Sequence, residues 1–462
     1  MTRFTVAGTI ALTLASAWVV EGQATQPRSR DCDTQFDGVK VGGVITTHFQ
    51  SYSTSAGHSN LFVGGGVNGY CRNSDQKVLA DSAEHYGDTR VLILIGRVRY
   101  IEKRMQLDAD TITYYMGEER LVAKGHVVGR TSAGTRFTGP SAVYLRAKQG
   151  LRDRSRLDAG GRPETWISGS DAGSATDKPD SVHVLADSLI SDNDSLVYAL
   201  GKVIIERPDL IATGDSAMMD QGREIASLRL TPKVVGRGEK SFALSGHAID
   251  IYSRNRQAER VRSAGAAKAT SDAVQLDADT IVLQVTDQQL SNATAWGPKG
   301  ARAAQSGRDI TADSIDVAMP RQILRAIHAV HHAKVATLAD SLNVRSRERD
   351  WFAGDTIIAE FDSVASRDTS SATRIRSLVA KGSARSWQQS ARSGVPVPDS
   401  TPAINYITGR MITVSFAEDR SLDRLSVLDQ VTGLLVQPSA DTTKAKPAPK
   451  KPGSGGTRRD SR

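Results

Sequence analysis

The sequence predicts an elongated all-β protein made of about ten stacked repeats with two strands each. Three observations support this class. A unit in which Asp and a hydroxyl residue precede alternating apolar positions recurs along the chain, a second unit with a central glycine alternates with it, and no segment beyond residue 20 keeps a helical period. Two strands cannot bury a face alone, so we expect the repeats to stack into one continuous core.

The first 24 residues are expected to form a secretory signal peptide. Arg3 supplies the positive start, an uncharged and mostly apolar run follows to Val20, and Gly22 and Ala24 offer the small residues that a signal peptidase reads. An uncleaved anchor helix is the alternative, because this run is just long enough to span a bilayer. In both cases we expect a periplasmic protein, free or associated with the inner or outer membrane.

Residues 25–76 do not fit the repeat and are interpreted as an N-terminal capping segment over the first layer. This segment holds the only two cysteines of the chain, Cys32 and Cys71. An oxidising compartment favours a disulfide between them. Two unrelated thiols are the alternative.

The Asp-containing unit runs through residues 77–335 and again through residues 336–437. Residues 147–181 are rich in Gly, Asp, Arg and Ser and are interpreted as a loop insertion in the first part. Residues 438–462 are basic, lack large apolar residues and are predicted to be a disordered tail. The ten copies place their Asp, or the residue that replaces it, at positions 81, 110, 140, 187, 215, 247, 279, 313, 355 and 410.

Apolar residues follow each Asp position at the second and usually the fourth place. A period of two indicates a strand with one buried face. At about 4.8 Å between strands, ten layers predict an interior on the order of 50 Å long. The residues expected to line this interior are Ile112, Tyr114, Tyr144, Met219, Ile249, Ile251, Ile281, Leu283, Ile315, Val317, Ile357, Ile412 and Val414.

The second unit has the form of an apolar strand with a glycine in its middle. Examples are centred on Gly125, Gly201, Gly265 and Gly382. Glycine within a strand marks a bulge or a sharp bend. Each repeat is therefore predicted to be two strands with a bend.

The two units together resemble the OstA-like family of lipopolysaccharide-transport proteins (LptA, LptC and the N-terminal domain of LptD). The resemblance is carried by Leu107–Tyr114 (LDADTITY), by Leu121–Val127 (LVAKGHV) and by their copies over residues 77–437. It implies an open, V-shaped β-jelly-roll, the "β-taco", whose apolar interior holds the acyl chains of lipopolysaccharide or a similar glycolipid. It also implies edge-to-edge strand pairing with other jelly-roll transport proteins of the inner and outer membrane, or between copies of the chain.

The resemblance thus implies a lipid-binding bridge or carrier in outer-membrane assembly, without catalysis and without a cofactor. A closed-core scaffold of the cell envelope needs the same apolar alternation and stays open as an alternative. A β-helix enzyme acting on polysaccharide is a second alternative, although its carboxylates would cluster and these are spread evenly. The pairs Asp108/Asp110 and Asp277/Asp279 have a spacing that can hold a divalent cation, but carboxylates repeat wherever the unit repeats, so no metal site is predicted.

The composition excludes several other classes. Apolar residues make up 39% and charged residues 24%, which excludes a wholly disordered chain, and two cysteines cannot form a four-cysteine zinc module. The net charge is +8, but the tail from residue 438 has seven Lys or Arg against two Asp, so it contributes +5 and leaves +3 for the rest. We therefore expect no nucleic-acid partner.

Overall fold

The computed structural model describes residues 34–72, 74–167, 182–193, 195–237, 242–255, 257–305, 307–339, 341–363, 373–418 and 422–438. This part of the chain is dominated by antiparallel strands, which confirms the all-β prediction. The expected signal peptide, Cys32 and the tail from residue 439 lie outside the described residues. Among the described residues, no helix has the length and apolar character needed to cross a membrane.

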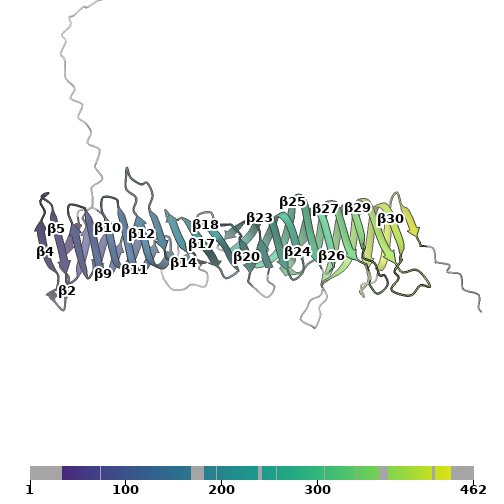
Figure 1. The fold of residues 1–462 in the computed structure, drawn as a ribbon, viewed down its shortest axis with the longest axis horizontal. Coiled ribbons are helices and arrows are strands. Elements are labelled where there is room, and N and C mark those ends of the chain that lie inside the picture. Colours follow the sequence, from purple (N-terminus) through teal and green to yellow (C-terminus); the bar gives the residue numbers. More distant parts are fainter. Residues whose placement is uncertain are drawn as a thin grey trace, which may run out of the picture.

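In the described part of the chain, thirty strands form one sheet, and β2 and β3 form a separate pair near the N-terminal end. Figure 1 shows that the strands lie across the long axis of an elongated molecule and follow one another in chain order. The elements are β1 (Thr34–Asp37), β2 (Lys40–Val41), β3 (Val44–Ile45), β4 (His48–Ser53), β5 (Ser59–Gly64), β6 (Val67–Cys71), β7 (Lys77–Ala80), β8 (Ser82–Tyr86), β9 (Val91–Ile101), β10 (Met105–Tyr115), β11 (Arg120–Thr131), β12 (Thr135–Leu145), β13 (Arg156–Gly160), β14 (Glu164–Ile167), β15 (Val182–Leu185), β16 (Ser188–Asp192), β17 (Leu196–Glu206), β18 (Leu210–Asp220), β19 (Ile225–Arg229), β20 (Lys233–Gly236), β21 (Phe242–Ser245), β22 (Ala248–Arg254), β23 (Gln257–Ser271), β24 (Gln275–Thr286), β25 (Gln289–Gln305), β26 (Arg308–Ala318), the 3-10 helix η1 (Pro320–Gln322), β27 (Ala326–Leu338), β28 (Arg349–Ser363), β29 (Thr373–Ser390), β30 (Ala403–Phe416), β31 (Leu422–Leu428) and β32 (Thr432–Val436).

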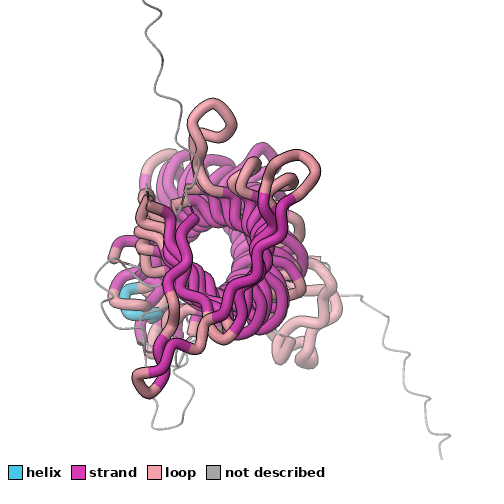
Figure 2. The backbone as a smooth tube through the Cα atoms, turned by 90° about the vertical axis from the view of Figure 1, so that its left-hand side faces the viewer, coloured by secondary structure: helices cyan, strands magenta, loops and turns pink. Residues whose placement is uncertain are grey.

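The large sheet is folded into two facing walls. A long strand pairs with its neighbour in two separate halves: β10 and β11 pair from Thr111 to Tyr115 in one half and from Met105 to Asp108 in the other, with a register shift between them. We call the wall that contains Thr111–Tyr115 wall 1 and the wall that contains Met105–Asp108 wall 2. Where two short strands replace a long one, β13 continues wall 1 and β14 continues wall 2. Viewed end-on, the walls surround an interior (Figure 2).

The walls are joined along one edge, which we call the corner. Register shifts fall at this corner in strand after strand, as between Lys124 and Val127 in β11 and between Leu200 and Val203 in β17. All ten Asp positions of the repeat unit lie at the corner, and the glycines of the second unit lie there on the strands between them. The prediction of two strands with a bend for each repeat is therefore confirmed.

Close approach between neighbouring strands explains why the second unit needs glycine. Gly125 has a φ of +76°, and a Cβ added there would lie 2.1 Å from Oδ2 of Asp110 on the neighbouring strand. The next residue, His126, also has a positive φ, and its Nδ1 lies 2.8 Å from the same carboxylate oxygen. The repeating Asp is thus a corner residue that packs against the bend of the next strand.

The adjacent histidines at 331 and 332 occupy the same kind of bend. Strand alternation would place them on opposite faces, but both have positive φ values, so alternation does not apply to them. Nδ1 of His332 lies 3.1 Å from the corner carboxylate of Asp313. They take the place of a glycine and its follower in the corner of β27.

Three predictions about the organisation are wrong in detail. Residues 147–181 were expected to be a loop, yet β13 and β14 lie in the part up to Ile167, where Leu157, Ala159 and Ile167 face inward; residues 168–181 lie outside the described residues. Within residues 25–76, the described part adds strands to both walls, through β5–β8 and β6–β7, so it belongs to the stack and does not cover it. Each repeat also adds two strands to each wall, so the stack is on the order of 100 Å long, twice the expected length.

Candidate functional site: the interior and its seam

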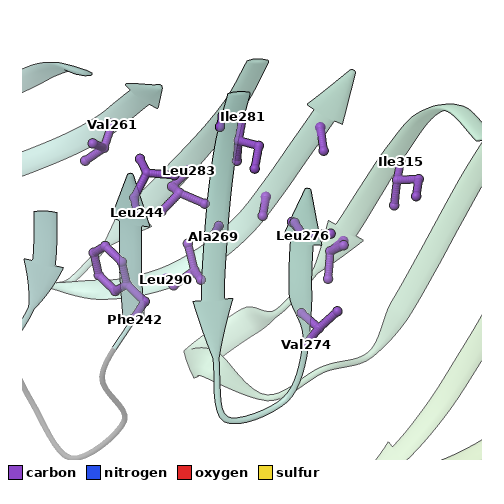
Figure 3. Packing of buried hydrophobic residues seen from close by; sticks show 14 of the residues in the cluster. Phe242, Leu244, Val261, Ala269, Val274, Leu276, Ile281, Leu283, Leu290 and Ile315 are labelled. Carbon is purple, nitrogen blue, oxygen red and sulfur yellow. The ribbon is translucent and has the colours of Figure 1, made fainter. Parts of the chain in front are cut away.

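The interior between the walls is the strongest candidate site. All thirteen residues expected to line it are buried, with exposed fractions from 0% at Ile112 to 6% at Met219. Their placement inside the stack shows that the strand register was assigned correctly. Figure 3 shows neighbouring interior side chains of β21 to β26, among them Ile281, Leu283 and Ile315. Their role as lipid contacts stays a prediction.

The interior side chains pack against one another. In β24, Ile281 is 0% exposed and Leu283 is 1% exposed, and both belong to a cluster of buried apolar residues that reaches Val414. Water does not reach such positions, so the protein's own side chains fill the interior between the walls in this structure. An acyl chain can share this space only if the walls move apart.

The expected single continuous core is instead two clusters of buried apolar residues. One extends from Val63 to Ala159 and the other from Ile167 to Val414. Polar side chains lie at the boundary: Thr165 is fully buried, and Ser191 is 5% exposed opposite Leu157. The hydroxyl oxygen of Thr165 has no hydrogen-bond partner. Polar groups among the inward positions therefore divide the interior, and the alternation pattern alone did not reveal this.

The edge opposite the corner is formed by the strand ends and turns of both walls, and we call it the seam. Near the N-terminal end, a charged network holds the seam together. Arg146, at the wall 1 end of β12, donates through Nε to Oε2 of Glu102 in wall 2 at 2.7 Å and through Nη1 to Oε2 of Glu119 at 2.7 Å. Tyr144 donates to Oε1 of Glu102 at 2.5 Å, and Tyr114 donates to Glu119 at 2.6 Å. This network ties wall 1 to wall 2.

The network is largely shielded from water. The side chains of Glu102, Glu119 and Arg146 are 7%, 10% and 18% exposed. Burial and the neighbouring Glu119 carboxylate hold the pKa of Tyr114 well above its usual range, and burial with Glu102 does the same for the pKa of Tyr100. The tyrosine hydroxyls therefore stay protonated and donate to the carboxylates at all physiological pH values.

A second polar contact crosses the seam in the middle of the molecule. Arg207 and Asp209, both 6% exposed, form an ion pair in the turn between β17 and β18 of wall 2. Arg207 donates to Oγ of Ser253 in wall 1 at 2.8 Å, and the backbone N–H of Ala258 in wall 1 donates to Asp209 at 2.9 Å. The middle of the seam is thus also held by hydrogen bonds between the walls.

Between β24 and β29 the seam is apolar and hollowed. Side chains of both walls line a shallow depression here, which has room for at most about one water molecule. Wall 2 supplies the ends of β25 and β27 and the start of β26, and wall 1 supplies the start of β27, the end of β28 and the start of β29. The lining residues are Val274, Ala303, Gln305, Arg308, Ile310, Ile327, Val335, Ala359, Phe361, Ile375 and Leu378.

The Asp-x-Asp pairs do not form a metal site in this structure. Asp108 accepts from Arg99 and Arg130, whereas Asp110 lies at the corner beside His126. Within the described ranges, no group of three or more histidine, cysteine or carboxylate side chains is placed to hold a metal ion. Cys71 takes part in a disulfide, and the only other cysteine, Cys32, lies outside the described residues.

Sequence reasoning missed the residues of the seam. Glu102, Arg146 and Arg207 lie in turns, outside the repeating units, and Glu102 and Arg146 are 44 positions apart in the chain. No local signal in the sequence sets them apart from ordinary loop residues, since the turns that hold Arg146 and Arg207 also contain Gly150 and Pro208. No family model matches the sequence, and no match was found among the curated proteins.

Proposed function

We propose that this protein is a periplasmic bridge or carrier that shelters the acyl chains of lipopolysaccharide or a similar glycolipid between its two walls. The observation that carries the proposal is the apolar interior, to which every repeat contributes along the length of the stack. Removing acyl chains from water stabilises them by about 25 cal/mol for each Å² of apolar surface. The walls joined at the corner then correspond to the two sides of the open, V-shaped jelly roll of the OstA-like family.

The proposed route requires the walls to separate at the seam. At the corner, the long strands continue from one wall to the other, so the backbone itself joins the walls there. At the seam, within the described residues, no strand pairing joins the walls. Opening at the seam breaks side-chain contacts and leaves the ladders of each wall intact. An acyl chain would replace the lost apolar contacts.

The ends of the stack favour pairing with other β-proteins. Of the described strands, β4 and β1 each pair on one side only at the N-terminal end, as do β31 and β32 at the C-terminal end. Large apolar side chains are exposed there, including Tyr52 at 58% and Leu434 at 57%. Free strand edges are templates for another strand, so we propose edge-to-edge contacts with other transport proteins or with further copies of the chain.

The test of the carrier function is mass spectrometry of lipid extracted from the protein after export and purification. An unrelated exported protein with the same leader serves as the control. Stoichiometric acylated glycolipid in this protein alone supports the proposal. Protein that contains no lipid and takes up none on incubation with lipopolysaccharide contradicts it.

The packed interior favours one second candidate function, a closed-core scaffold of the cell envelope. A scaffold would use the same walls and the same edges but would never open the seam. Hydrogen exchange separates the two functions. A carrier shows exchange at the seam turns that slows when lipid is added, and a scaffold shows exchange that lipid does not change.

A further inference from the structure

We propose that the outer face of wall 2 from β27 to β32, at the C-terminal end of the stack, binds the surface of an anionic phospholipid bilayer (Figure 1). We call it the aromatic face, and it consists of the outward side chains of residues 334–338, 349–353, 385–389, 404–408 and 432–436. Contact with a bilayer here needs no acyl chain between the walls, so it is independent of the proposed carrier role.

Strand pairing places four large side chains in one row across the aromatic face. Trp351 of β28 is the register partner of Trp387 in β29. The row continues through Tyr406 of β30 to Leu434 of β32. Phe352, the next residue in β28, is buried, so the row points away from the interior.

The row is accessible from outside. Leu434 is 57% exposed, and the three aromatic side chains are half-buried. The rings of Trp351 and Tyr406 pack edge to face, with their centres 6.3 Å apart. Tryptophan and tyrosine combine an apolar ring with a polar N–H or O–H group, and they therefore favour the boundary between water and lipid.

The row does not continue along wall 2. Toward the N-terminal end, the same register line passes through Ala336, Asp309, Ala304, Gln275 and Thr270, which are small or polar. In wall 1, the described outward positions of β28 to β31 hold no aromatic residue. The aromatic side chains are therefore confined to one wall at one end, which indicates an interaction surface.

Cations accompany the row. Lys334 and Arg385 are exposed on the aromatic face, and Nζ of Lys334 lies 5.3 Å from the ring centre of Trp351. None of the described outward positions of this face is Asp or Glu, and the carboxylate of nearby Asp309 is bound by Arg349. Each Lys or Arg near an anionic bilayer strengthens binding about fivefold, so the face favours anionic over neutral lipid.

The segment that follows β32 adds to this charge. It begins two residues after Val436, which is 45% exposed on the aromatic face. Residues 438–462 contain seven Lys or Arg and two Asp. Peripheral binding strengthens with both the apolar area that enters the bilayer and the attraction to anionic lipids, and this end of the chain supplies both.

Vesicle sedimentation tests the proposal with the chain from residue 25 onward, the form expected after export. We expect vesicles of phosphatidylethanolamine with about a quarter phosphatidylglycerol to bind at least about tenfold more strongly than phosphatidylcholine vesicles, and high salt to weaken this binding. Equal binding to both vesicles, or binding to neither, overturns the proposal. Sedimentation with purified peptidoglycan but with neither vesicle assigns the face to a polysaccharide and likewise overturns it.

A double charge reversal tests whether the aromatic face makes the contact. Lys334→Glu with Arg385→Glu should weaken binding to the anionic vesicles at least about tenfold. The matched control is Lys233→Glu with Lys268→Glu, which changes the net charge equally at exposed outward positions of wall 2 in β20 and β23. Equal loss in both pairs overturns the assignment, because total charge would then determine binding.

Brominated phosphatidylglycerol locates the contact, because bromine on the acyl chains quenches the fluorescence of tryptophans that touch lipid. Quenching should be largely lost when Trp351→Phe is combined with Trp387→Phe. It should be retained when Trp166→Phe is combined with Trp296→Phe, since these residues of β14 and β25 lie outside the aromatic face. Quenching that persists in the first pair and disappears in the second places the contact elsewhere and overturns the proposal.

Discussion

Replacement of Arg146 by methionine should loosen the N-terminal part of the stack. The substitution keeps a long apolar side chain but leaves the carboxylates of Glu102 and Glu119, 7% and 10% exposed, without their shared cation. Removing one partner of a buried ion pair costs about 3–5 kcal/mol. We expect a loss near the lower end, about 3 kcal/mol, because Tyr114 and Tyr144 still donate to these carboxylates.

Hydrogen exchange measures this loss where it occurs, because each layer of a stacked protein contacts only its neighbours. Amides of β9 to β12 should exchange about 100-fold faster, whereas amides of β24 to β29 should not change. Arg97→Met is the control, since Arg97 is 88% exposed in its pair with Asp81, where solvent screening leaves an ion pair little effect on stability. Adding Glu102→Gln and Glu119→Gln to Arg146→Met should recover part of the loss. If Arg146→Met and Arg97→Met have equal effects, the network does not hold the seam.

Three further predictions concern the corner, the interior boundary and pH. Gly125→Ala should destabilise β10 and β11 by about 1–3 kcal/mol in thermal unfolding, because φ is +76° and the new Cβ meets Asp110; an unchanged melting temperature would contradict the close approach. Thr165→Val should stabilise the fold by up to about 1 kcal/mol in urea unfolding, since its buried hydroxyl has no partner; a loss would show that it has one. Stability should fall above about pH 10, because the unfolded chain then releases the proton that the folded state retains on Tyr114; constant exchange protection up to pH 11 would contradict this.

The sequence pattern was sufficient for the faces of the strands and for the corner. Alternation after each Asp position identified Ile281 and the other interior residues, because a period of two reports directly which side of a strand is buried. The glycine of the second unit identified the bend, because only a residue without a side chain fits against Asp110. Because these features are local and recur in every repeat, ten imperfect copies support the same assignment of buried faces and bends.

Features that depend on contacts between distant turns could not be predicted in this way. Glu102 and Arg146 meet across the seam only because the two walls fold together at the corner. The division of the core at Thr165 arises from single polar residues at inward positions, which a pattern tolerant of Ala and Ser does not detect. Composition likewise misassigned β13, whose outward Arg156 and Asp158 gave it the appearance of a loop.

The orientation of the strands determines how the molecule would bear a pulling force along its long axis. Because the strands lie across the long axis, their backbone hydrogen bonds point along it, so tension from end to end passes through every strand pair in turn (Figure 1). A series of joints fails at its weakest member. The weakest joint is the one where the two apolar clusters meet, between β13 and β16 in wall 1 and between β12 and β14 in wall 2, because polar interior residues there add little cohesion. Under load, the protein would separate there into two stacks, each with its own intact core.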